Sequence, residues 1–369
     1  MAPVDGDSGV IYGLDHPARV IATQLGEQEK PIFIAATQSL KSVNQVCVLE
    51  YDEDINQVSR HSYIHKKGEI WHLSCSPLQK ELLATCYSSL DGKVAPGCTL
   101  WSLADALPTE DSTVSELVEL SHLDCKGSQS VASFQWQPVS GTKAVASVDN
   151  KLVFVDVAAS GKTLTVTDII ECETKGQQRV GVSKWNPHHN CNSVAVICEG
   201  SVKIYDIRSR NVQFGTDHCH YPSVRDIDFN PNRQYYLATG GDDCKIKIWD
   251  VRSFKEPLTT AKHSHWVWCV RYNPVHDQLL LSSSSDERLI LRCFASHSSE
   301  SYDLTDDNGE DGSPKLVDGV VRVFEDHEES VYSCEWSAGD PWIFGSLSYD
   351  GRVIINKVPR AVKYKILQL

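Results

Sequence analysis

The chain has 369 residues and a formal net charge of −14, with 41% hydrophobic and 23% charged residues. This composition is typical of globular proteins. The acidic balance disfavours binding to nucleic acid or anionic membrane, because there is no surplus of Lys and Arg to replace counterions. The sequence has no apolar stretch of about 18 residues, and its first ten residues lack the basic and apolar regions of a signal peptide, so we expect neither direct membrane insertion nor secretion.

Short β-strands are predicted along the whole chain. Val10–Leu14 is a spare strand, and Pro31–Gln38 and Asn44–Asp52 are expected to be the second and third strands of a first unit. A stretch then recurs that begins with a β-branched residue, has a large and mostly aromatic residue near its end, and closes on Pro or Ala. Its six copies are Ile70–Pro77, Val131–Pro138, Val180–Pro187, Val224–Pro231, Val267–Pro274 and Val331–Ala338.

Each copy is followed by two further apolar runs and a weaker fourth segment. Four short strands repeated about every 40–45 residues are typical of β-propeller blades. With the first unit, the count predicts an all-β propeller of seven blades, formed as a single domain by residues 1–369. Val10–Leu14 or Lys363–Leu369, both predicted strands, should close the ring, and we favour the former because closure protects free sheet edges.

Two insertions interrupt the period. Residues Ser296–Asp318 are polar and acidic, and we expect them to form a disordered loop before the last blade. Asp105–Ser115 is expected to be a second loop. Both are interpreted as solvated spacers.

The unit containing Tyr235–Asp250 resembles the WD40 family, whose name comes from the dipeptide found here at Trp249–Asp250. In such blades a His, a hydroxyl, an Asp and the Trp form a buried hydrogen-bonded tetrad that fixes the blade. The matching residues of this unit are His220, Thr239, Asp243 and Trp249. The next unit has His263, Ser282 and Asp286 with Arg292 in place of Trp, and the last has His327, Ser346 and Asp350 with Asn356.

No motif indicates chemistry. The 13 cysteines include no C-x-x-C pair and lie mostly in apolar runs, which favours buried thiols in a reducing, cytoplasmic compartment. Asp217–His220 and Pro187–Cys191 are rich in possible metal ligands, but we interpret both as loops. Gly-rich phosphate loops, G-x-S-x-G and H-E-x-x-H are absent from the sequence. We therefore predict no enzyme, cofactor, metal or small-molecule substrate.

Two surfaces are candidates for protein partners. The residue six positions before the Pro differs from unit to unit. We predict that its side chains, together with the nearby Trp266, form an anchor site for a partner on the top face. The alternative is that these side chains plug the channel. The large side chains at this position are Trp71, Arg225, Trp268 and Tyr332. On the bottom face, Asp206–Arg208 and Asp250–Arg252 resemble the DxR element of substrate receptors for cullin-4 ubiquitin ligases, or they brace local turns.

Longer strings resemble one family of WD40 adaptors, which associate with the multisubunit EARP and GARP tethering complexes. They are Gly68–Pro77, Trp185–Asn190, Val224–Asp250, His263–Asn273 and Asp340–Leu367. The resemblance covers nearly the whole chain. It implies a non-catalytic scaffold that supports endosomal recycling, retrograde traffic to the trans-Golgi network and dense-core vesicle cargo sorting, held at these membranes through its partners. It assigns no binding residue.

Overall fold

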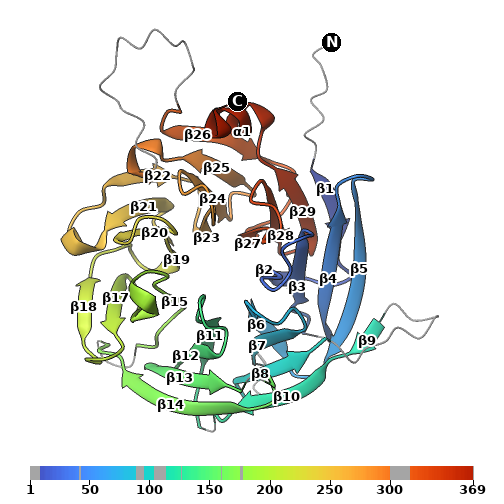
Figure 1. The fold of residues 1–369 in the computed structure, drawn as a ribbon, viewed down its shortest axis with the longest axis vertical. Helices are drawn as coiled ribbons and strands as arrows, with labels where there is room; N and C mark the ends of the chain where they lie inside the picture. Colours follow the sequence, from blue (N-terminus) through green and yellow to red (C-terminus); the bar gives the residue numbers. More distant parts are fainter. Residues whose placement is uncertain are drawn as a thin grey trace.

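The computed structural model describes residues 9–40, 43–88, 95–103, 114–125, 127–158, 160–174, 178–299 and 316–368. These residues form six four-stranded sheets and one five-stranded sheet, arranged as seven blades around a central channel (Figure 1). The predicted seven-bladed all-β propeller is confirmed. The first strand of each blade lies nearest the channel, and the later strands lie progressively farther out (Figure 1).

The blades follow chain order. Blade 1 contains β2 (Ala18–Thr23), β3 (Ile32–Thr37), β4 (Asn44–Asp52), β5 (Gln57–His65) and β9 (Val114–Glu116). Blade 2 contains β6 (Glu69–Cys75), β7 (Leu82–Ser88), β8 (Gly97–Ser102) and β10 (Val118–Leu123). Blade 3 contains β11 (Val131–Trp136), β12 (Lys143–Val148), β13 (Lys151–Val157) and β14 (Leu164–Glu171). Blade 4 contains β15 (Ser183–Trp185), β16 (Ser193–Cys198), β17 (Ser201–Asp206) and β18 (Val212–Thr216).

The remaining three blades have the same plan, and short 3-10 helices occur in three loops. Blade 5 contains β19 (Val224–Phe229), β20 (Tyr236–Gly241), β21 (Lys245–Asp250) and β22 (Thr259–Lys262). Blade 6 contains β23 (Val267–Tyr272), β24 (Leu279–Ser284), β25 (Leu289–Cys293) and β26 (Gly319–Phe324). Blade 7 contains β27 (Val331–Trp336), β28 (Ile343–Ser348), β29 (Arg352–Lys357) and β1 (Val10–Gly13). The 3-10 helices are η1 (His189–Cys191), η2 (Val251–Ser253) and η3 (Ala295–His297).

The N-terminal strand closes the ring, as favoured from the sequence. β1 pairs antiparallel with β29, with Val10 opposite Ile355 (Figure 1). The last blade thus contains both the first and the last strands of the described chain, and β1 covers the edge of β29 that would otherwise be free.

The strand predicted at Lys363–Leu369 is wrong, because this segment belongs to helix α1 (Arg360–Leu367). The alternation of apolar and polar residues in KYKIL is also compatible with a helix, in which Val362 and Ile366 lie four residues apart on one face. Both pack into the core between blades 6 and 7. Among the described residues, no helix has the length and apolarity needed to cross a bilayer.

The core lies between adjacent blades. One cluster joins Ala195 and Ile204 of blade 4 to Ile227, Phe229 and Trp249 of blade 5, all of them buried. Each blade buries both of its faces against its neighbours, which explains why the second and third strands are nearly continuous apolar runs.

The two predicted insertions are more structured at their ends than expected. Val114 and Ser115 begin β9, which pairs in parallel with β5 as a fifth strand of blade 1. At the acidic insertion, the backbone N–H of Ser296 donates to Asp318 at 2.9 Å, so the two ends are tied together. Residues 300–315, where the disordered loop is predicted, lie outside the described residues.

Candidate functional site

Six of the seven innermost strands carry the same β-bulge near their start. In β6, for example, the pairing with β7 passes from Ile70 to His72 and leaves Trp71 unpaired. The unpaired residues of the six strands are Arg19, Trp71, Ala132, Arg225, Trp268 and Tyr332. A bulge frees its extra residue from the ladder and re-aims its side chain. The predicted variable position is therefore the bulge position, where side chains can differ without disturbing the blade.

Five of these side chains, together with Trp266, form a cluster at the top of the channel. The Arg19 guanidinium lies 4.5 Å from the centroid of Tyr332, 5.2 Å from Trp268 and 5.3 Å from Trp71. Arg225 lies 4.8 Å from Trp268 and 5.9 Å from Trp266. These distances are those of cation–π contacts, so two arginines join aromatic side chains from three blades.

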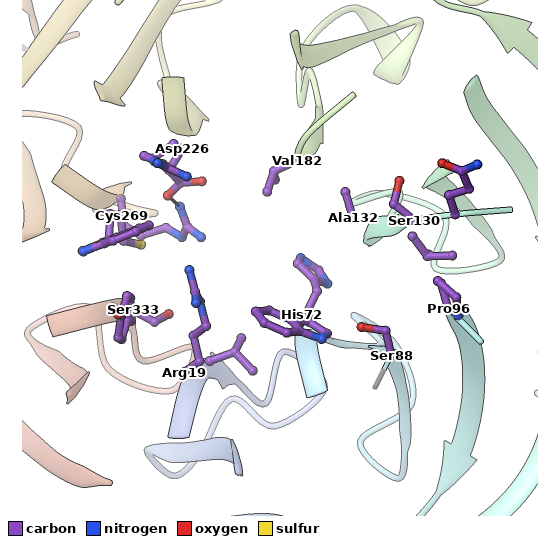
Figure 2. A pocket seen from close by; sticks show the side chains of 18 of the residues that line it. Arg19, His72, Ser88, Pro96, Ser130, Ala132, Val182, Asp226, Cys269 and Ser333 are labelled. Atoms are coloured by element: carbon purple, nitrogen blue, oxygen red, sulfur yellow. Dashed lines mark hydrogen bonds and ion pairs between the residues drawn. The ribbon is translucent and has the colours of Figure 1, made fainter. Parts of the chain in front are cut away.

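This cluster surrounds a cavity of about 610 Å³, which we call the channel mouth. Figure 2 shows Arg19 pointing into the middle of the cavity, with Asp226 across from it. The residues that form its aromatic and basic lining are Arg19, Trp71, Arg225, Trp268 and Tyr332. A cavity with aromatic and guanidinium walls has the composition of a protein-binding hot spot.

The structure brings together all the predicted top-face residues and places them in different environments. Trp268 is half-buried, its Nε1 donates to Ser285 at 2.6 Å, and its ring packs on Tyr332 at 4.8 Å. Trp266 is 43% exposed. Trp268 thus packs inward and Trp266 faces solvent, and the partner-anchor role stays a prediction.

Arg19, at the centre of the cluster, was missed from the sequence. Its strand β2 does not end in the aromatic-x-Pro pattern, and Ala18 stands where the other blades have a β-branched residue. Only the register shift between Ala18 and Val20 shows that Arg19 occupies the bulge position. Burial lowers the pKa of its guanidinium, which nevertheless stays charged, as arginine does in proteins.

The polar cluster of blade 5 is of a different kind. His220 Nδ1 contacts Asp243 at 2.6 Å, its Nε2 contacts the Thr239 hydroxyl at 2.7 Å, and Trp249 Nε1 donates to the same hydroxyl at 2.9 Å. Burial lowers the pKa of His220, whereas His220 lowers that of Asp243 against the effect of burial. This is the tetrad geometry described for WD40 blades. No group of three or more His, Cys, Asp or Glu among the described residues is arranged to hold a metal ion.

Blades 6 and 7 have altered versions of this network. His263 lies 3.0 Å from Asp286 and 2.9 Å from Ser282, and Arg292, in place of Trp, donates to the Lys262 carbonyl. Hydrogen bonds from His263 outweigh burial and hold the pKa of Asp286 at about 2. In blade 7, His327 contacts Ser346 and Ser348, each at 2.8 Å, and Ser348 donates to Asp350 at 2.5 Å. Asn356, in the Trp position, is buried.

Blade 2 contains a partial network that the sequence analysis missed. His65 lies 3.1 Å from the Thr85 hydroxyl, to which Trp101 donates at 2.8 Å. Burial lowers the pKa of His65 to about 4. The sequence signal that could have revealed this network is the order of its residues. His65, Thr85 and Trp101 follow one another as His220, Thr239 and Trp249 do in blade 5, except that an insertion separates the last two.

Largely buried ion pairs join adjacent blades around the channel. Arg271 pairs with Asp226 and donates from Nε to Glu335 at 3.0 Å. Lys184 lies 3.6 Å from Asp228. Lys184, Asp228 and Arg271 each stand three positions before the Pro of their repeat, and Glu335 stands three positions before Ala338. The sequence analysis overlooked this periodicity.

The bottom-face pairs lie where third strands end. Arg252 makes two hydrogen bonds to the Asp250 carboxylate, at 2.6 and 3.0 Å, and lies 4.5 Å from the Tyr235 ring. Asp206 accepts from the Ser209 backbone at 2.8 Å. Both aspartates brace local turns, which accounts for them without a partner. The receptor role of Arg208 and Arg252 stays a prediction.

Comparison with known proteins relates the chain to one group throughout its length. Residues 6–292 match the family model "EIPR1 beta-propeller", and residues 319–355 match "WD domain, G-beta repeat". The human "EARP and GARP complex-interacting protein 1" is 40% identical, covering 99% of this chain and 100% of that protein. "EARP-interacting protein 1" of Caenorhabditis elegans is 33% identical, covering 98% and 99%. "WD repeat-containing protein DWA2" of Arabidopsis thaliana is 32% identical, covering 96% and 97%.

Proposed function

The chain belongs to the EIPR1 β-propeller family, and on that premise we propose that it is a non-catalytic adaptor of vesicle-tethering complexes. Its partners are subunits of the EARP and GARP complexes, after which its relatives are named. It supports endosomal recycling, retrograde traffic to the trans-Golgi network and dense-core vesicle cargo sorting. It acts from the cytoplasm and reaches endosomes and the trans-Golgi network through these partners.

One observation carries the binding role, namely the channel mouth. Aromatic and Arg side chains are the residues most enriched at the centres of protein interfaces. Here they meet on the bulge positions of blades 1, 2, 5, 6 and 7, which leaves each blade intact. We therefore place the partner surface at the channel mouth and the neighbouring Trp266.

Affinity purification of the tagged full chain from cells tests this proposal. Wild-type protein is expected to recover EARP and GARP subunits, and the double variant Trp266→Ala/Tyr332→Ala is expected to recover much less of both. Tyr364→Ala is the matched control, because Tyr364 is an exposed aromatic residue on α1, outside the channel mouth.

Two results would contradict the proposal. Failure of folded wild-type protein to recover any tether subunit would remove the adaptor role. Recovery of a cullin-4 adaptor instead, lost in Arg208→Ala/Arg252→Ala, would favour the substrate-receptor hypothesis drawn from the bottom face.

A further inference from the structure

The channel mouth contains hydrogen-bond donors that the described residues leave without acceptors. Arg19 contacts three aromatic rings, but no carboxylate or carbonyl among the described residues accepts from its guanidinium. Trp71 Nε1 is buried and also has no partner there. Buried donors are normally paired, and leaving one unpaired costs about 1–3 kcal/mol.

A third donor comes from His72, next to Trp71 on β6. Its Nε2 lies 3.0 Å from the Gln135 amide nitrogen, which donates to it, and burial lowers the pKa of His72 to about 3. The neutral ring therefore carries its proton on Nδ1, and this atom is buried without a partner in the described part of the chain. Arg19, Trp71 and His72 all line the same cavity.

The charged residues around the cavity are joined in ion pairs, with the exception of Arg19. Asp242 pairs with Arg225 through two hydrogen bonds, at 2.6 and 2.8 Å, and Asp226 pairs with Arg271. Among the described charged residues that line the cavity, only Arg19 has no opposite charge beside it. The one described lining charge without an ion-pair partner is thus a cation, in a chain whose formal net charge is −14.

We propose that the channel mouth binds the side-chain carboxylate of an acidic segment of a partner protein, held by Arg19 and the Trp71 indole N–H. This deepens the proposed function, on which it rests, by naming the chemistry that the tether subunit must present. A guanidinium binds a planar carboxylate through parallel hydrogen bonds. The aromatic walls of Trp268 and Tyr332 can contact apolar residues on either side of the carboxylate.

The same geometry disfavours a free phosphate. A phosphate brings close to two negative charges, whereas the cavity offers one uncompensated cation. Asp226 lies in the same cavity and repels additional negative charge. At about 610 Å³ the cavity is also far larger than one anion and has room for a peptide side chain with its neighbours.

The test uses arrays of overlapping peptides from the EARP and GARP subunits, probed with the purified full chain. A matched array carries Asn and Gln in place of every Asp and Glu. We expect binding to acidic peptides on the first array and its loss on the second. The tightest peptide is then labelled with fluorescein, and its dissociation constant is measured by anisotropy.

Substitutions at the site give the expected size of the effect. Arg19→Gln should weaken this peptide at least about tenfold, since it removes hydrogen bonds to a charged group. Trp71→Phe, which keeps the ring and removes the N–H, should weaken it about three- to tenfold. Arg210→Gln is the control and should bind like wild type, because Arg210 is exposed and pairs with Asp168 away from the mouth. Melting curves check folding, and Trp71→Phe retains the test if Arg19→Gln is unstable.

Three outcomes would overturn the inference. They are equal binding to the acidic and neutral arrays, unchanged affinity in both site variants, and displacement of the peptide from wild type by inorganic phosphate beyond what sodium chloride causes at the same ionic strength. Each is distinct from failure of the adaptor role. Tether subunits recovered equally by wild type and Arg19→Gln would remove the carboxylate site and keep the adaptor, whereas no recovery by wild type would remove the adaptor itself.

Discussion

Two polar clusters of this propeller have similar side chains and opposite hydrogen-bonding states. In blade 5, His220, Thr239 and Trp249 satisfy one another within 2.9 Å. At the channel mouth, Arg19 and Trp71 line a cavity, and no described residue accepts a hydrogen bond from the Arg19 guanidinium or from the buried Trp71 Nε1. Both clusters contain Trp and a cationic or titratable side chain, so residue type alone does not separate them.

The difference indicates what each cluster contributes. A satisfied buried network stabilises the blade, because removing any member leaves the others unpaired. An unsatisfied cluster costs stability in the free protein, and a ligand that supplies the acceptors recovers that cost. Substitutions in the first cluster should therefore reduce the free energy of unfolding, and substitutions in the second should mainly reduce binding.

The largest loss of stability is expected from Arg271→Leu. This substitution tests a buried network whose members satisfy one another through ion pairs rather than neutral hydrogen bonds. The Arg271 side chain is only 15% exposed and pairs with Asp226 and Glu335, so its removal leaves two carboxylates without a cation. Breaking a buried pair from one side costs about 3–5 kcal/mol. Urea unfolding should show this loss or a failure to fold, while exposed Arg210→Leu should unfold like wild type. Equal curves for the two variants would contradict the interpretation.

Thr239→Val should have the next largest effect. The substitution keeps the shape of the side chain and removes the hydroxyl shared by His220 and Trp249. We expect the free energy of unfolding to fall by about 2–3 kcal/mol, since two buried groups lose their partner. Thr260→Val, at an exposed position of β22, is the matched control. A cost no greater than that of the control would show that the tetrad does not stabilise blade 5.

A pH effect of about 2 kcal/mol is expected from His65, which ends β5 of blade 1 and contacts Thr85 of blade 2. Its folded-state pKa is about 4, below the value of about 6.5 in an unfolded chain. The unfolded state therefore takes up a proton first as the pH falls, and the stabilising contribution of neutral His65 is lost from about pH 6.5 down to about pH 4. Between pH 7 and pH 5 this amounts to about 2 kcal/mol.

The measurement compares urea unfolding at the two pH values in wild type and His65→Asn. Because burial also lowers the pKa of His72 and His327, wild type carries several contributions of the same sign, and only the difference between the two proteins reports His65. The variant should lose about 2 kcal/mol less on acidification. Identical pH dependence would show that His65 titrates normally.

The sequence predicted most of the fold, since blades 2 to 7 carry their own strand and turn signals. It missed β2 as a first strand because Thr23 and Leu25 stand where other blades have the large residue and the Pro. Arg19 was therefore absent from the predicted top face. A local pattern identifies a blade only if that blade keeps the pattern, although the closed ring still forces its strand into register.

Contacts between residues of different blades could not be predicted from the sequence, for a different reason. Asp226 and Arg271 lie in separate blades, and so do Arg19 and Tyr332. No spacing within one repeat links such residues; they meet because the ring places equivalent strands side by side. The sequence identified the bulge position as variable. Only the arrangement of all the blades together shows that the side chains at this position surround a cavity with unpaired donors.

The smallest loss of stability is expected from Trp266→Ala, which sharpens the comparison most. Trp266 is 43% exposed and packs edge-on against Trp268 at 6.0 Å, so its removal should cost about 1 kcal/mol or less. Trp268→Ala should cost more, because that ring also contacts Arg19, Arg225 and Tyr332. Melting curves and recovery of tether subunits should then separate: Trp266→Ala keeps the fold and loses partner binding. If Trp266→Ala instead destabilised the protein as much as Thr239→Val, the channel mouth would belong with the tetrad as a structural cluster, and the partner surface would have to be sought on another face.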